Sequence, residues 1–302
     1  MQSLFWHRKN KEYDMDDFYR LFVRVLRSLV NCLIVFINLP SFQFKGSIRL
    51  KDNGGGICVL GNGPSLKNNY KEVLERVDKL SSVLVVNTFA NTDYYELIKP
   101  SFYLIVDPAF FTNTVDKRLS AIQKSTVETI ISRTKWKMTL FLPSKAKHSN
   151  FALNLAEHEF IKVEFFRNVP VYEGSEKLNR FLYKHNLANP PFRNVLIAAI
   201  FFSLKMGFSN INVWGADHSW HENLYLGKDN KLYVKDVHFF EEDPEKIPLK
   251  NSKGSPVKVH EELFSIGRAL IIYHSLNALS ESLGCKIVNR SSKTWIDAFE
   301  RE

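Results

Sequence analysis

The 302-residue sequence predicts an α/β protein with a Rossmann-like, mostly parallel sheet flanked by helices, a lid-like insertion and an N-terminal amphipathic helix. A short β-rich run leads into a glycine turn and then a helical stretch, further apolar runs end in Asn or Asp, and helical stretches separate most of them. We expect residues 1–53 to form the N-terminal helix and a linker. Residues 54–302 would form the α/β domain, with the insertion at residues 218–259.

The N-terminal element runs from Phe18 to Leu39, where Arg20, Arg24 and Arg27 recur at helical spacing before an almost wholly apolar dozen residues. The uninterrupted apolar part is too short to span a bilayer easily. Such a helix lies in the headgroup region, with its apolar side chains among acyl chains and its arginines near anionic lipid phosphates. The alternative is a helix packed on its own domain or on a second subunit.

Features of targeting and redox state favour a cytoplasmic protein, peripheral at the inner face of the cytoplasmic membrane. No small-residue cleavage site follows the apolar stretch and acidic residues precede it, which disfavours a secretory signal peptide. The three cysteines have no spacing typical of a metal site, and a reducing compartment suits them. They are Cys32, Cys58 and Cys285.

A glycine turn follows the first apolar run, Ile57–Leu60, and precedes a helical stretch at residues 70–80. Glycines let backbone N–H groups approach a phosphate, and a following helix adds the positive end of its dipole. The turn lacks the Gly-Lys-Ser/Thr of a Walker A loop and the third glycine of the dinucleotide fingerprint, which disfavours ATP hydrolysis and NAD chemistry. The residues expected to hold a phosphorylated ligand are Gly61, Asn62, Gly63, Pro64 and Ser65.

Polar residues end three further apolar runs. Residues 82–86 lead to Asn87, residues 102–106 to Asp107, and residues 211–214 to Asp217, three residues after the run. Ligands of open parallel sheets bind outside the carboxyl ends of the strands, so these side chains and Asn62 are expected to line one crevice. Turn chemistry alone also accounts for Asn or Asp at such positions.

Four segments together resemble the bacterial CMP-dependent sialyltransferases of glycosyltransferase family 42 and the related MptE-like superfamily. They are GNGPSLK from Gly61, VVNTF around Asn87, VDPAFF from Asp107, and FRNVLIAAIFFSLKMGFSNINVWGAD ending at Asp217. The likeness runs roughly from residue 57 to residue 291. It implies a transferase that uses a CMP-linked donor as substrate and needs no further cofactor.

The resemblance also implies roles for particular residues. Asn62 and Asn87 would contact the CMP part of the donor, whereas Asp107 stands where the family has an asparagine. Tyr225 occupies the spacing of one tyrosine that holds the leaving phosphate, and Ser219 replaces the other. His260, which precedes a late helical run, is similar in order to the family's general base.

Two more residues complete the expected site. Arg193 precedes an apolar helix, where its guanidinium could grip phosphate bidentately, although a surface arginine at a helix start explains it as well. His218 is a second candidate for the base.

The insertion after Asp217 is rich in aromatic residues and histidines, and its LYL and KLYV segments predict a hairpin. A lid that excludes water would protect a reactive donor from hydrolysis. The side chains that could touch substrate are His218, Trp220, His221 and His238. The spacing of the three histidines is a poor match to a metal site, so we expect no metal.

The net charge of the chain indicates which binding partners to expect. Lys and Arg outnumber the acids 41 to 32, which gives a formal charge of +9 and an attraction to anionic ligands and lipids. No recognition motif for nucleic acid accompanies this charge. The acceptor is expected to be a glycan or lipid-linked glycan of bacterial surface polysaccharide. Formation of a homo-oligomer is a further open alternative.

Three alternatives remain. The first is a CMP-dependent phosphonate or phosphoalcohol transferase, in which Asp107 would recognise an amine. The second is an MptE-like pyrophosphokinase. The third is a non-catalytic, nucleotide-binding membrane module.

Overall fold

The computed structural model describes residues 15–38, 55–80, 82–111, 117–155, 157–235, 246–251 and 254–302. The chain divides into two compact units. The N-terminal unit comprises residues 1–43 and 169–189, and the sheet unit comprises residues 44–168 and 190–302. The linker expected before residue 54 lies outside the described residues.

The N-terminal unit contains the predicted amphipathic helix, α1 (Met15–Asn38), and a short helix, α6 (Glu176–Lys184). The sequence did not indicate that residues 169–189 would accompany α1. Asn31 of α1 is buried, and its side-chain amide donates to Tyr172 O at 2.9 Å and accepts from Tyr172 N at 3.1 Å. The contacting side of α1 therefore includes polar side chains as well as the buried Val35.

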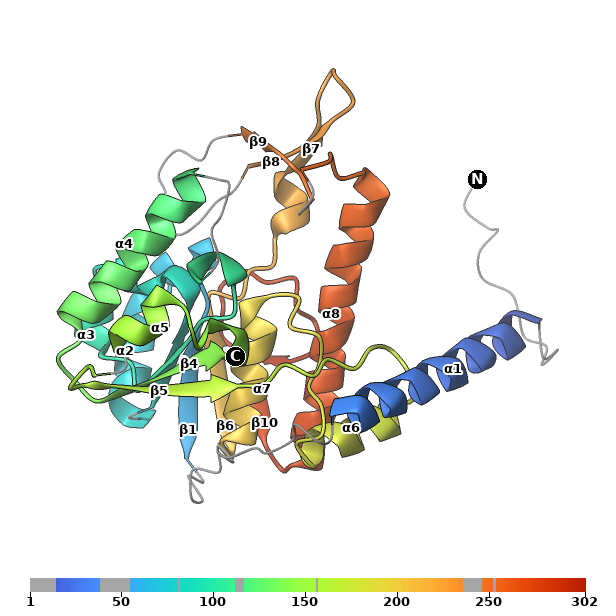
Figure 1. Ribbon diagram of the computed structural model, residues 1–302, viewed down its shortest axis with the longest axis horizontal. Helices are drawn as coiled ribbons and strands as arrows, with labels where there is room; N and C mark the ends of the chain where they lie inside the picture. The colour runs from blue at the N-terminus through green and yellow to red at the C-terminus, as the bar shows by residue number, and fades with distance from the viewer. Residues whose placement is uncertain are drawn as a thin grey trace. The chain divides into compact units, whose positions relative to one another are not determined.

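The sheet unit is built on eight strands in the order β11-β10-β6-β1-β2-β3-β4-β5, and every neighbouring pair is parallel (Figure 1). The expected strands at residues 57, 82, 102 and 211 are confirmed as β1, β2, β3 and β6. The bounds are β1 Gly56–Leu60, β2 Val83–Val86, β3 Phe102–Leu104, β4 Met138–Pro143, β5 Ile161–Phe166, β6 Asn210–Trp214, β10 Lys286–Asn289 and β11 Glu300–Arg301.

Helices cover both faces of this sheet, so its central strands read as continuous apolar runs. On one face Cys58 and Val85 belong to a buried cluster that includes Val73 of α2. On the other face the ring of Phe141 lies 5.2 Å from that of Phe202 in α7. The helices are α2 Tyr70–Leu80, α3 Tyr95–Ile98, α4 Lys117–Arg133, α5 Asn150–Leu155, α7 Val195–Lys205 and α8 Val259–Ser282.

The strand order reverses at β1. The chain proceeds from β1 through β2, β3 and β4 to β5 on one side, and β6 then pairs with the other side of β1. In open α/β sheets, this switch point opens a crevice above the carboxyl ends of the strands. The topology therefore places the ligand-binding position where the first glycine turn begins.

The lid-like insertion contains the predicted hairpin. Strand β7 (Leu224–Leu226) pairs antiparallel with β8 (Leu232–Lys235), and β9 (Lys246–Pro248) extends them to a three-stranded sheet that the sequence did not indicate. Figure 1 shows this small sheet as an element separate from the main one. His238 lies outside the described residues.

Candidate functional site

A pocket of about 200 Å³ lies at the switch point of the sheet. The segments that follow β1, β2 and β6 form it together with the first residues of α7 and parts of the insertion. The predicted site residues that line it are Gly61, Asn62, Gly63, Pro64, Asn87, Asp217 and His218. Three of the four polar residues expected to line one crevice, Asn62, Asn87 and Asp217, therefore line this pocket, and Asp107 does not.

The glycine turn serves close packing of two strand ends. A Cβ on Gly61 would lie 2.5 Å from Gly215 O, and one on Gly63 would lie equally close to that oxygen and overlap the Asp217 carboxylate. Gly215 itself has φ +64°, a left-handed conformation that favours glycine. These glycines let the loop after β1 touch the loop after β6.

The backbone amides of this turn are already hydrogen-bonded within the protein. Gly61 N donates to Trp214 O at 2.8 Å, Gly63 N to Gly215 O at 3.0 Å, and Ser65 N to Asp217 Oδ1 at 3.0 Å. Pro64 has no N–H. The amides of Gly61, Gly63 and Ser65 are therefore not free to cradle a phosphate, because the neighbouring strand end and a carboxylate already accept from them.

Asp217 braces the turn. Its carboxylate accepts from both the amide and the hydroxyl of Ser65, the latter at 2.7 Å. Burial raises its pKa, while the two Ser65 hydrogen bonds and the charge of Lys293 oppose that rise. The side chain holds the loop after β1 against the loop after β6, and Ser65 lies behind the pocket wall rather than among its lining residues.

Two asparagines leave buried acceptors at the pocket. Asn62 Nδ2 donates to Val86 O at 3.2 Å and to Thr88 Oγ1 at 3.1 Å, which fixes the orientation of the amide. Asn62 Oδ1 and Asn87 Oδ1 are buried and have no hydrogen-bond partner among the described residues. A buried acceptor without a donor costs free energy, and because both asparagines line the pocket, a ligand bound there could supply the donor.

Asn87 also carries an unusual backbone conformation. Its φ is +42°, in the left-handed region that asparagine tolerates better than most residues. Its carbonyl oxygen accepts from Tyr103 Oη at 2.5 Å, and that buried tyrosine holds the loop after β2 in place. The amide side chain is thus presented to the pocket by a fixed turn.

His218 lies in a buried hydrogen-bond network. Its Nε2 is 2.5 Å from Tyr273 Oη, which donates to Asn194 Oδ1 at 3.0 Å. Asn194 Nδ2 also lies 3.4 Å from His218 Nε2, so Asn194, His218 and Tyr273 each contact the other two. The residue has φ +53°, so the chain turns sharply where the histidine enters the pocket.

Burial controls the charge of His218. It lowers the pKa of the imidazole from 6.5 to about 3, so the ring is neutral at physiological pH. The Trp220 ring, whose centroid is 4.3 Å away, lies beside it. A neutral histidine can accept a proton from a hydroxyl group bound next to it.

This burial predicts a pH-dependent stability. Between pH 6.5 and about 3 the unfolded chain binds a proton at His218 that the folded chain does not. The free energy of unfolding therefore decreases as the pH falls through this window, by at most about 1.4 kcal/mol per pH unit, and the effect vanishes above it. In urea unfolding at several pH values, the free energy of unfolding of His218→Asn should change less steeply with pH than that of wild type. Asparagine is chosen because it tolerates φ +53°. Parallel curves for the two proteins would contradict a buried neutral imidazole.

Besides Ser65, four predicted residues lie apart from the pocket lining. Asp107 caps the 3₁₀ turn that follows it, accepting from Ala109 N at 2.9 Å. Arg193 is exposed, and its neighbour Asn194 lines the pocket instead. Tyr225 stacks on Tyr233, with ring centroids 5.3 Å apart.

His260 is the fourth. It is exposed in the first turn of α8, thirteen residues before Tyr273 on the same helix. At 1.5 Å per residue this separates the two by about 20 Å along the axis. Since Tyr273 contacts His218 directly, the structure does not bring His260 to the pocket.

The sequence analysis missed Asn194 and Tyr273. Asn194 caps α7 by accepting from Ile197 N at 2.9 Å, and an asparagine before an apolar helix is a recognisable start signal. Tyr273 gives no such signal, because its contacts depend on how α8 packs. Among the described residues, no group of three or more His, Cys, Asp or Glu side chains is placed to hold a metal ion.

Comparisons with protein-family models and with curated proteins found no match. Among solved structures, the chain is similar to a MAf glycosyltransferase from Magnetospirillum magneticum AMB-1, with a TM-score of 0.43 and 10% sequence identity. The match covers 84% of this chain and 34% of that chain, so the chain spans about a third of the length of that structure.

Proposed function

We propose that the protein is a transferase that takes a CMP-activated donor and passes its activated group to a hydroxyl of a glycan or lipid-linked glycan in bacterial surface polysaccharide assembly. The activated group is a sugar in this proposal, as the resemblance to the sialyltransferases implies. The switch-point pocket is its nucleotide site.

The unpaired oxygens of Asn62 and Asn87 carry this proposal. Both are acceptors, so they suit a ligand that offers N–H or O–H donors. Cytosine offers its N4 amine and ribose offers hydroxyls, whereas uracil presents an acceptor at the equivalent base position. A phosphate oxygen would leave both asparagine oxygens unsatisfied.

The chemistry then needs a base beside the acceptor hydroxyl. His218 lines the pocket and is neutral, so we assign it the role that the resemblance gives to His260. The acceptor oxygen forms a bond to the donor carbon, the bond from that carbon to the CMP phosphate oxygen breaks, and CMP leaves with the electron pair. The His218 imidazole takes the hydroxyl proton, and the charge that forms on CMP favours the resulting imidazolium.

The hydrogen-bonded glycine turn weighs against the pyrophosphokinase alternative. A triphosphate cradle depends on free backbone N–H groups, and those of Gly61, Gly63 and Ser65 have partners in the protein. The Asp107 carboxylate, which the phosphonate alternative requires, caps its own turn. Neither alternative gains an observation that favours it.

Release of CMP from a CMP-activated sugar tests the proposal. The full-length protein is incubated with the donor, with and without a glycan acceptor, and free CMP is measured. We expect acceptor-dependent release. A non-catalytic module would bind CMP and leave the donor intact, and that outcome would contradict the proposal.

Membrane association is the second part of the proposal, and the exposed side chains of α1 are the evidence for it. Eleven large apolar side chains of this helix are exposed, while its polar side chains Ser28 and Asn31 contact residues 172–179. This is the reverse of a helix on a soluble core. The exposed residues are Phe18, Tyr19, Leu21, Phe22, Val25, Leu26, Leu29, Val30, Leu33, Phe36 and Ile37.

We assign this face to the headgroup region of the cytoplasmic leaflet. By length and composition, α1 is also long and apolar enough to cross a membrane. Arg20, Arg24 and Arg27 lie within it, and Arg27 pairs with Glu173 at 2.8 Å, which favours a helix parallel to the surface. A lipid-linked acceptor would then be within reach of the membrane-bound protein.

Substitution of this face gives a third test. Leu26 and Leu33 are each about half exposed, and replacing both with Asp should weaken binding to vesicles with anionic lipid by roughly 100-fold, since each buried leucine is worth about 1.5–3 kcal/mol. Leu97→Asp, on a leucine of the sheet unit that is 66% exposed, is the control. Vesicle flotation measures the effect. Equal flotation of both variants would show that α1 faces a protein partner instead.

A further inference from the structure

Strand β5 ends the sheet and presents an unusual edge. It pairs with β4 along its whole length, and among the described residues its other side has no strand partner. Exposed edges invite pairing with another chain, and proteins usually cover or shorten them. β5 has six residues, contains no proline, and has an open groove of about 860 Å³ along it.

Backbone groups of alternate residues point to the free side. Phe160 O accepts from Met138 N of β4 at 2.9 Å, so the C=O group of residue 160 and the backbone groups of every second residue after it face β4. Those of Val163 and Phe165 and the carbonyl of Ile161 therefore face outward, while Ile161 N donates to His158 O at 3.4 Å. A second strand can pair with the edge only through these residues.

The sequence of the edge is complementary to itself. It reads Phe-Ile-Lys-Val-Glu-Phe-Phe from residue 160 to residue 166. In an antiparallel pair with a twofold axis at Val163, Lys162 lies opposite Glu164 of the other strand and Ile161 lies opposite Phe165. A twofold interface repeats each contact, so two opposite-charge pairs and two apolar pairs flank the central valines.

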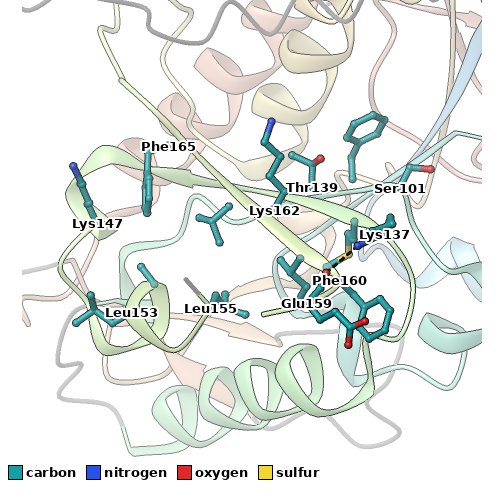
Figure 2. Close-up of a pocket in the computed structure, with 15 residues that line it drawn as sticks. Ser101, Lys137, Thr139, Lys147, Leu153, Leu155, Glu159, Phe160, Lys162 and Phe165 are labelled. Atoms are coloured by element: carbon teal, nitrogen blue, oxygen red, sulfur yellow. Dashed lines mark hydrogen bonds between the residues drawn. The ribbon is translucent and has the colours of Figure 1, made fainter. Parts of the chain in front are cut away.

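Side chains along the groove support this pairing. Phe165 and Leu153 of α5 remain 38% and 58% exposed, although both are apolar. Figure 2 shows Leu153 and Leu155 beside the strand and Lys162 extending toward the other side, near Thr139. Lys162 lies 2.6 Å from Glu164 within one chain, so the lysine that would repel a second strand is already neutralised by a carboxylate.

We propose that β5 pairs antiparallel with β5 of a second copy of the chain, about a twofold axis at Val163. The two eight-stranded sheets then form one continuous sheet. Lys162 bonds Glu164 of the second copy in place of its own, and Leu153 and Phe165 become covered. β5 is four strands from β1, so the nucleotide pocket of each copy stays separate from this contact.

Charge exchange tests the pairing and its register. Lys162→Glu and Glu164→Lys each place like charges opposite one another twice, and each should weaken the dimer roughly 10-fold or more. The double variant Lys162→Glu with Glu164→Lys restores opposite charges and should restore the dimer. Sedimentation equilibrium of the full chain, in a non-ionic detergent that covers α1, measures the association.

Other outcomes would overturn the proposal. These are a monomeric wild-type chain, single variants that associate like wild type, or a double variant as weak as the singles. Thermal melting checks that every variant is folded. If a charge reversal fails that check, Lys162→Gln and Glu164→Gln replace the reversals, and each should weaken the dimer without raising repulsion.

Discussion

Replacing His218 with asparagine is expected to lower the rate of group transfer by roughly 10²–10⁴-fold, the usual contribution of a general base. Asparagine tolerates the left-handed backbone at this position, φ +53°, so the turn is preserved. CMP affinity should change little, because in the proposal Asn62 and Asn87 hold the nucleotide. Single-turnover rates and CMP titration separate the two effects.

His260→Ala is the matched variant for this experiment. His260 is exposed at the start of α8 and lies outside the pocket lining, so we expect its substitution to leave turnover nearly unchanged. The reverse result, full activity in the His218 variant and loss of activity in the His260 variant, would show that His260 is the general base. The order of residues along the chain favoured His260, and the geometry favours His218.

Asn62→Ala and Asn87→Gly are each expected to weaken CMP binding by roughly 10- to 100-fold. Each substitution removes an acceptor and so leaves a buried hydrogen-bond donor of the ligand without a partner. Glycine is chosen at residue 87 because it accepts φ +42° without strain. The two together should abolish measurable binding.

Asn91 provides the control for this pair. It ends the 3₁₀ turn that begins at Asn87, and its Oδ1 is also buried without a partner among the described residues, yet it does not line the pocket. Asn91→Ala should therefore bind CMP like wild type. Equal weakening by all three substitutions would mean that they loosen the loop after β2 rather than remove ligand contacts.

The parallel core of the fold was predictable because its strands are buried on both faces. Val83–Val86 and Asn210–Trp214 stand out as apolar runs with polar residues after them. The last strand, β11, has two exposed charged residues, Glu300 and Arg301, and so gives no apolar signal. The association of α1 with residues 169–189 depends on side-chain contacts that no local pattern reveals.

The site was predictable in part. Asn62 and Asn87 follow strand ends directly, so topology alone brings them together. The hydrogen bond from the Ser65 amide to Asp217 was not predictable, because the two residues are far apart in sequence and meet only when β6 pairs with β1. Tyr273 was missed for the same reason, since its position depends on the packing of α8.

The central claim is that buried asparagine oxygens at the switch point select a cytidine nucleotide. Calorimetric titration of the full-length protein with CMP, UMP, GDP and ATP tests it most directly. We predict that CMP binds tightest, with at least about a 10-fold preference over UMP, because the N4 amine of cytosine meets an acceptor that uracil cannot satisfy. Equal or tighter binding of UMP, or a preference for a purine nucleotide, would contradict this account.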